Sequence, residues 1–294
     1  LLFFANIFVN SKENLIRMED SFKSIDKTLF NEFIINIRGK YSNEAISFLR
    51  SQGIQSIFNI NSRFGWFHDT YILTNKINFQ YVFCWLEDQI CLNKDYFSDY
   101  LQEIYKFDLD IARYTYSYDL SNFFDINKFE NTKYMYFKLM SKNDFDGIKN
   151  APFIISYGSL LKKELFNKIL LDNNPGIWSK YTPFGFEKNS EQHSWLPLKI
   201  GFLKKEIFAS IDDDHAIHGN SLQSRGLYPA RTKVRKKSNH LTKYIQSGKK
   251  YLIKEKFNFF ITLIKLFYNI IRLSISFRIF VKYYNYIETK KIKP

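Results

Sequence analysis

The N-terminal third of the chain alternates between short apolar runs and segments patterned as helices, and this alternation strongly constrains the fold. The apolar, β-rich runs lie at 2–9, 32–37, 54–60 and 79–86. Each run is followed by a segment with helical spacing or a helix cap, at 13–27, 42–49, 66–76 and 93–103. Strands that alternate with helices are typical of a mostly parallel sheet flanked by helices. The sequence therefore predicts an α/β fold.

The remaining sequence predicts a continuation of this domain and then a region of different composition. Further strands are expected at 108–118, 134–140, 153–156 and 198–202, and a helix at 160–171. Residues 1–230 are thus expected to form one domain. Residues 231–294 predict a basic connector followed by a C-terminal amphipathic helix.

Polar side chains follow the predicted strands of the first domain where each strand ends. Asn10, Arg38 and Arg63 follow the first three strands, and the adjacent acids Glu87 and Asp88 follow the fourth. In sheets of this kind, ligands bind outside the carboxyl ends of the strands. The acidic pair in YVFCWLEDQI is therefore a candidate site. The alternative is a core strand followed by a solvated acidic turn.

Four segments together resemble the family 2-like glycosyltransferases, which have the Rossmann-like GT-A fold. ANIFVNSKENLIRMEDSFKSI resembles the first βα unit of that family, and EFIINIRGK its second strand. RFGWFHDTYILTNKINFQYVFCWLEDQI resembles the segment that leads to the metal-binding DXD motif, and GSLLKKELFNKI the segment after it. The resemblance covers roughly residues 3–230. It implies transfer of a sugar from a nucleotide-sugar donor to a glycan or lipid-linked acceptor, in cell-surface polysaccharide synthesis.

Two positions depart from the family pattern. Asn36 stands where the family has an acid that contacts the base, which leaves the nucleotide open. Trp85 stands where the first acid of the DXD motif is expected, so Glu87 and Asp88 must act alone or borrow a ligand.

The resemblance also implies a divalent metal, Mg²⁺ or Mn²⁺, at the departing diphosphate. Carboxylate oxygens are suitable ligands for such hard cations, which makes Glu87 and Asp88 the first candidates. The family often completes the site from later in the chain, and here the run Asp212-Asp213-Asp214-His215 with His218 is the candidate. The alternative for this run is a solvated acidic turn that caps a helix.

The resemblance further implies a general base and contacts to the donor. Glu187 is the candidate base, with Glu191 and Asp214 as alternatives, and a surface loop acid is the competing interpretation of Glu187. Arg225, together with Arg231, is expected to contact the diphosphate. The donor-binding candidates are Asn10, Asn36, Arg38, Arg63 and Arg225.

The net charge of +14 is concentrated in one region, because residues 231–256 hold ten Lys and Arg residues against the single acid Glu255. Such an excess indicates a polyanionic partner, either nucleic acid or an anionic membrane. The run 257–281 that follows is apolar apart from one narrow polar stripe. A helix lying in the membrane interface is the favoured interpretation. A helix packed on the domain or on a partner copy in a homo-oligomer, and a membrane-spanning helix, are the alternatives.

These features predict a cytoplasmic enzyme held peripherally on the inner face of a membrane. The N-terminal run has no preceding basic region and predicts a first strand rather than a signal peptide. Cys84 and Cys91 match no zinc or disulfide framework, which indicates a reducing compartment. The competing functions are a nucleic-acid-binding protein, a nucleotidyltransferase and a non-catalytic relative in glycan assembly. A nucleotidyltransferase is disfavoured because residues 6–20 contain no glycine.

Overall fold

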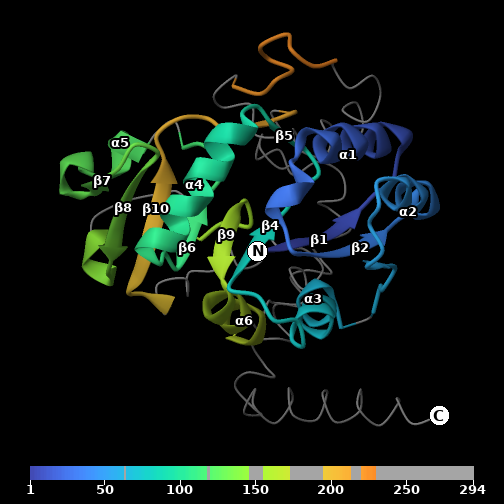
Figure 1. The fold of residues 1–294 in the computed structure, drawn as a ribbon, viewed down its shortest axis with the longest axis horizontal. Helices are drawn as coiled ribbons and strands as arrows, with labels where there is room; N and C mark the ends of the chain where they lie inside the picture. Colours follow the sequence, from blue (N-terminus) through green and yellow to red (C-terminus); the bar gives the residue numbers. More distant parts are fainter. Residues whose placement is uncertain (63, 118–119, 146–154, 173–194, 213–219, 230–294) are drawn as a thin grey trace, which may run out of the picture. The chain divides into compact units, whose positions relative to one another are not determined.

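The computed structural model of the chain describes residues 1–62, 64–117, 120–145, 155–172, 195–212 and 220–229 (Figure 1). The chain divides into two units, Leu1–Ala230 and Arg231–Pro294. All of the described residues belong to the first unit. The described structure is therefore that of the first unit alone.

A nine-stranded mixed sheet with helices on both faces forms the centre of this unit (Figure 1). Its strand order is β3-β2-β1-β4-β9-β6-β10-β8-β7. Strands β9 and β8 run antiparallel to their neighbours, and the other seven strands share one direction. The strands are β1 (Leu2–Phe8), β2 (Glu32–Arg38), β3 (Ile57–Phe58), β4 (Tyr81–Cys84), β6 (Ile111–Arg113), β7 (Glu130–Asn131), β8 (Met135–Met140), β9 (Ser159–Lys162) and β10 (Leu198–Leu203). The predicted α/β fold with a mostly parallel sheet is confirmed.

Two layers of helix cover the sheet. Helices α1, α2 and α4 lie on one face, and α3 and α6 lie on the other (Figure 1). The helices are α1 (Lys12–Ser24), α2 (Ser42–Ser51), α3 (Trp66–Thr74), α4 (Lys94–Phe107), the short α5 (Leu120–Phe123) and α6 (Lys163–Asp172). Short 3₁₀ turns lie at Lys27–Leu29, Ile126–Lys128 and Lys142–Phe145. The four strand–helix units predicted for the first 103 residues are all present.

Alternate residues of β1 supply two separate cores. Phe3, Ala5 and Ile7 belong to the core on the α1 side, where they join Phe22 and other side chains of the covering helices. Leu2 and Phe4 belong to the core on the α3 side. Because successive side chains of a strand point to opposite faces, one apolar run fills both layers.

The predicted helix at 160–171 is wrong at its start. Ser159–Lys162 forms strand β9, which is inserted antiparallel between β4 and β6, and helix α6 begins only at Lys163. Leu160 and Leu161 are both buried, one in each core. A strand is the element that places two adjacent leucines in opposite layers, and the short run resembles helix when considered without its neighbours.

Other predicted strands differ mainly in length. The strand expected at 54–60 contracts to Ile57–Phe58, and that at 108–118 to Ile111–Arg113. Of the strand expected at 153–156, residues 155 and 156 lie in no strand, and the other two residues lie outside the described part.

A second, two-stranded sheet lies beside the large one. Strand β5 (Gln89–Cys91) pairs antiparallel with β11 (Phe208–Ser210). Cys84 and Cys91 are both buried, and both are free cysteines. Within the described ranges, no helix has the length and hydrophobicity needed to cross a bilayer. The predicted amphipathic run 257–281 lies outside those ranges.

Candidate functional site

The acidic turn Glu87–Asp88 joins the two sheets. It follows β4 and Leu86, and it leads directly into β5. Both acids are half-buried. Ser21 of α1 holds the turn in place, because its Oγ donates a hydrogen bond to the Gln89 carbonyl oxygen at 2.5 Å. The two carboxylates are therefore presented from a fixed backbone at the carboxyl end of β4.

Trp85 has a structural role that explains the missing first acid. Its side chain is fully buried, and its ring lies 5.3 Å from that of Phe3 and 5.6 Å from that of Phe22. Its Nε1 donates a hydrogen bond to Ser21 Oγ at 2.9 Å. Position 85 therefore points into the core on the α1 side. An acid at this position would be buried among aromatic rings, at a large desolvation cost.

The second acidic segment lies next to the first. Ile211 N donates a hydrogen bond to the Asp88 carbonyl oxygen at 2.7 Å, which extends the β5–β11 pairing by one step. Asp88 and Asp212, far apart in sequence, thus occupy neighbouring strand ends. This is the proximity that a shared site requires. Asp214, His215 and His218 lie outside the described residues.

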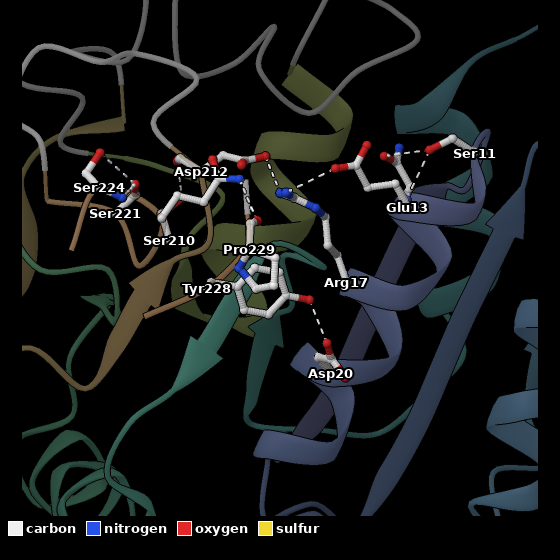
Figure 2. A network of polar contacts seen from close by, with 12 residues as sticks. Ser11, Glu13, Arg17, Asp20, Ser210, Asp212, Ser221, Ser224, Tyr228 and Pro229 are labelled. Carbon is white, nitrogen blue, oxygen red and sulfur yellow. Dashed lines mark hydrogen bonds and ion pairs between the residues drawn. The ribbon is translucent and has the colours of Figure 1, made fainter. Parts of the chain in front are cut away.

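Asp212 itself is held by Arg17 of helix α1 (Figure 2). Both side chains are almost fully buried, and the Arg17 guanidinium also lies 3.4 Å from Glu13. As a metal ligand, Asp212 would have to share its carboxylate with this guanidinium. In the geometry observed, the ion pair anchors the end of β11 to α1.

Side-chain hydrogen bonds of Tyr228 and Arg225 help to fasten the segment 220–229 to the domain. Tyr228 Oη donates a hydrogen bond to Asp20 of α1 at 2.6 Å (Figure 2). Arg225 pairs with both carboxylate oxygens of Glu206, at 2.7 and 2.5 Å. The predicted diphosphate ligand Arg225 is therefore engaged with a carboxylate.

The carboxyl ends of β1 and β2 are locked together by a glycine turn. Gly39 has a φ of +104°, and a Cβ there would lie 2.5 Å from the Val9 carbonyl oxygen. Only glycine allows this approach. The turn brings Lys40 N within 3.4 Å of the side-chain oxygen of Asn10, an exposed donor-binding candidate. Arg63, the candidate after β3, lies outside the described residues.

Asn36, the candidate for contact with the base, is fully buried in a hydrogen-bond network. Its Nδ2 donates to Asn6 Oδ1 at 3.0 Å and to the Ile60 carbonyl oxygen at 2.8 Å. Its Oδ1 accepts from Ile60 N at 2.7 Å. Asn6 Nδ2 in turn donates to Thr70 of α3 at 3.1 Å. One Asn36 side-chain N–H and its Oδ1 thus hold the segment after β3 at Ile60, and the other N–H is used by Asn6.

Arg38, at the end of β2, has a different environment. The residue is only 7% exposed, and its guanidinium carbon lies 5.9 Å from the centroid of the Phe8 ring. Burial lowers the pKa of the guanidinium, while the charges of Asp69, Tyr157 and Glu87 act to raise it. Glu87 of the acidic turn is thus one of the charges that act on Arg38.

Sequence reasoning missed several residues that shape this site. Asn6 was not singled out, although it interrupts an apolar strand as Asn36 does in the neighbouring strand. Asp69 is 1% exposed and accepts a hydrogen bond from Ser62 N at 3.1 Å. Arg17 and Ser21 gave no signal, because their positions on a helix face resemble ordinary surface residues.

Glu87 and Asp88 are the described residues whose chemistry suits a hard cation. Carboxylate oxygens are suitable donors for Mg²⁺ or Mn²⁺, and the turn presents two acids side by side. Among the described residues, no group of three or more His, Cys, Asp or Glu side chains is placed to hold a metal. The candidate bases Glu187 and Glu191 lie outside that part of the chain, as does Arg231.

A surface cavity also lies at the opposite end of the strands, near the amino ends of β2 and β3. Its volume is about 360 Å³, and it is lined by residues that include Lys27, Asn31 and Gln52. No candidate from the sequence lies in its lining. This cavity is the alternative location for a ligand.

Comparisons with known proteins assign no family. No family model and no curated protein matches the chain. Among solved structures, S. aureus TarS 1–349 is similar at a TM-score of 0.41 and 14% identity, over 71% of this chain and 60% of that one. The same values hold for its complex with UDP. The longer TarS structure matches at 15% identity and a TM-score of 0.41, over 36% of its length.

The chain therefore spans less than two thirds of the length of these structures. Similarity at this level carries no assignment of activity.

Proposed function

We propose that the chain is a glycosyltransferase that moves a sugar from a nucleotide-sugar donor to a glycan or lipid-linked acceptor, in cell-surface polysaccharide synthesis. The observation that carries the proposal is the hydrogen bond between Ile211 N and the Asp88 carbonyl oxygen. It brings two acidic segments together at the carboxyl end of the parallel strands, where sheets of this class bind ligands.

Glu87 and Asp88 are proposed to hold a divalent metal at the donor diphosphate. The metal would supply positive charge to the leaving group as its bond to the sugar breaks. His215 and His218 are proposed as further ligands. Asp212 contributes chiefly by anchoring its segment to Arg17, which sets the approach of the residues that follow it.

Donor binding and base catalysis are assigned to the remaining candidates. Arg38 and Asn10 are proposed to line the donor pocket, together with Arg63, while Asn36 forms its floor. Glu187 is proposed as the base that accepts the proton of the acceptor hydroxyl, with Asp214 as the alternative.

A donor screen tests this function. UDP-, GDP- and CMP-sugars are added with and without Mn²⁺, and the melting temperature of the whole chain is measured. We expect one donor to raise the melting temperature in a Mn²⁺-dependent manner, because a ligand that binds only the folded state stabilises it. Glu87→Ala and Asp88→Ala should each abolish the Mn²⁺-dependent increment.

Glu130→Ala is the matched control for this screen. Glu130 is an exposed acid on β7, the strand at the far edge of the sheet from β3. This variant should respond to donor as the unmodified chain does. If no donor shifts the melting temperature under any condition, the chain is not a nucleotide-sugar-dependent enzyme.

A non-catalytic role in glycan assembly is the second candidate, and Trp85 is the observation that favours it. A chain that lacks the first acid of the motif can retain donor binding and lose turnover. Release of free nucleotide from the bound donor, in the presence of a cell-wall or lipid fraction as acceptor, separates the two roles. Binding without release in every fraction would favour the non-catalytic role.

Attachment to an anionic membrane through residues 231–294 is proposed from the charge and the apolar run in that region. Flotation with vesicles of phosphatidylglycerol tests it, with a chain ending at residue 230 as the comparison. We expect only the longer chain to float, and its flotation to weaken as salt rises. A steep, salt-sensitive affinity for DNA or RNA without donor binding would instead favour the nucleic-acid hypothesis.

A further inference from the structure

Three arginines of the described structure, Arg17, Arg38 and Arg225, differ in how their charges are balanced. Arg17 pairs with Asp212 and Glu13, and Arg225 pairs with Glu206. For Arg38 no carboxylate among the described residues lies within ion-pair distance, and its Nε has no hydrogen-bond partner there. The residue is nevertheless only 7% exposed. A buried charge without a partner is costly, so this position calls for a reason.

The surroundings of Arg38 keep its guanidinium charged but provide no acceptor for its N–H groups among the described residues. Asp69 is buried nearby, and its charge raises the pKa of Arg38 against the lowering effect of burial. Asp69 itself forms no ion pair with Arg38 within the described residues: its Oδ2 accepts a hydrogen bond from Ser62 N at 3.1 Å, while its Oδ1 lies 3.6 Å from His68 Nδ1 and has no hydrogen-bond partner there. An arginine remains protonated in a folded protein. Arg38 therefore presents a fork of N–H donors with nothing from the described chain to receive them.

The backbone and neighbouring side chains around this fork are fixed before any ligand arrives. Phe8 and Arg38 are register partners on β1 and β2, so they share the face on which α3 lies. Asn6 and Asn36, the preceding pair on that face, are hydrogen-bonded to each other at 3.0 Å. The Phe8 ring is 48% exposed and lies against the guanidinium, at the solvent side. A site built in this way loses little entropy when it binds.

We propose that Arg38 is the receptor for a two-oxygen anionic group of the substrate. The planar guanidinium matches such groups with two parallel hydrogen bonds. The group is the diphosphate of the donor or the carboxylate of an acidic sugar, which present the same chemistry. This inference rests on the proposed function for the identity of the substrate, and it gives to Arg38 the anion-binding role that the sequence suggested for Arg225.

Anion binding by the whole chain in EDTA tests the proposal without metal or activity. Inorganic pyrophosphate and glucuronate are titrated separately into the unmodified chain, Arg38→Met, Arg38→Lys and Arg50→Met. Arg50 is an exposed arginine in the last turn of α2 and serves as the matched control. We expect Arg38→Met to lower the affinity for one of the two anions by roughly 10- to 100-fold, as loss of a charge-assisted hydrogen-bond pair implies. The anion affinity of Arg38→Lys should lie between those of Arg38→Met and the unmodified chain, and Arg50→Met should bind both anions as the unmodified chain does.

The anion that loses affinity identifies the source. Loss of pyrophosphate binding indicates the diphosphate, and loss of glucuronate binding indicates an acidic sugar. The melting temperature without ligand gives a second readout. Arg38→Met should melt at or above the unmodified chain, because the variant removes an unpaired buried charge. A lower melting temperature would mean that Arg38 is structural and would overturn the proposal, as would equal anion affinity in Arg38→Met.

The outcomes also separate this inference from the proposed function. If no nucleotide sugar binds while pyrophosphate binding still depends on Arg38, the proposed function fails and the anion receptor stands. If nucleotide sugars bind Arg38→Met as tightly as the unmodified chain and neither anion loses affinity, the receptor fails and the proposed function stands. Failure of both anions to bind the unmodified chain overturns the receptor alone.

Discussion

The two faces of strands β1 and β2 carry different chemistry at their carboxyl ends. On the α1 side the side chains stay apolar along the strands, through Ile7 and Ile37. On the α3 side they begin apolar and then change to Asn6, Asn36 and Arg38, all of them buried. Buried polar groups stabilise a fold less readily than apolar ones. The difference indicates that the α1 face builds stability and the α3 face builds the site.

Removal of the Trp85 side chain should lower the stability most, because it leaves a cavity in the apolar core on the α1 side. We expect Trp85→Ala to lower the free energy of unfolding by about 3–5 kcal/mol. Phe8→Ala, at the exposed end of the other face, should cost less than about 1 kcal/mol. Urea denaturation of both variants measures the contrast. Equal losses would contradict the assignment of the two faces.

The ion pair of Arg17 sharpens the comparison with unpaired Arg38. Arg17→Met should cost about 3–5 kcal/mol of stability, because it leaves Asp212 buried without its cation. The double variant Arg17→Met with Asp212→Leu should recover most of that loss. A double-mutant cycle by urea denaturation tests this, and a cycle without coupling would show that the pair does not anchor β11 to α1.

Asn36 tests the polar network on the α3 face. Asn36→Leu should cost about 1–3 kcal/mol, because Asn6 Oδ1 and the Ile60 backbone groups lose the partners that Asn36 provides. Hydrogen exchange of the Ile60 amide should accelerate at the same time. Unchanged exchange at Ile60 would indicate that the segment after β3 is held by other contacts.

The two thiols provide the smallest test, one on each face. Burial raises the pKa of Cys91 to about 11 and that of Cys84 well above its usual range. At pH 8 each thiol should therefore react with Ellman's reagent roughly two orders of magnitude more slowly than a free cysteine, since the thiolate is the nucleophile. Both should react at once in 8 M urea. Rapid labelling of either thiol in the native chain would contradict its burial.

The sequence predicted the parts of this fold that follow local patterns. The strand–helix units and the polar carboxyl ends could be read because apolar runs and caps are local signals. Strand β9 was missed because two adjacent leucines show their opposite directions only once the neighbouring strands are in place. Likewise, Trp85 looked like a missing ligand, and only its packing against Phe3 and Phe22 shows that this position faces the core.

The charges of the site could be foreseen only in part. The proximity of Asp88 to Asp212 was expected, whereas the partner of Asp212 was not. Arg17 and Arg225 carry no mark in the sequence that distinguishes a paired guanidinium from a free one. Arg38 has the same residue type, and it differs because it is buried without an ion-pair partner among the described residues.

Hydrogen exchange of the whole chain, with and without Mn²⁺ and the donor found by the screen, tests the central claim most directly. We expect donor and Mn²⁺ to slow hydrogen exchange at residues 38–41 and 86–89, at the carboxyl ends of β2 and β4, and to leave exchange at the β7–β8 hairpin unchanged. Protection confined to the cavity around Lys27, Asn31 and Gln52 would place the ligand at the opposite end of the strands. That result would contradict a donor site built on Glu87, Asp88 and Arg38.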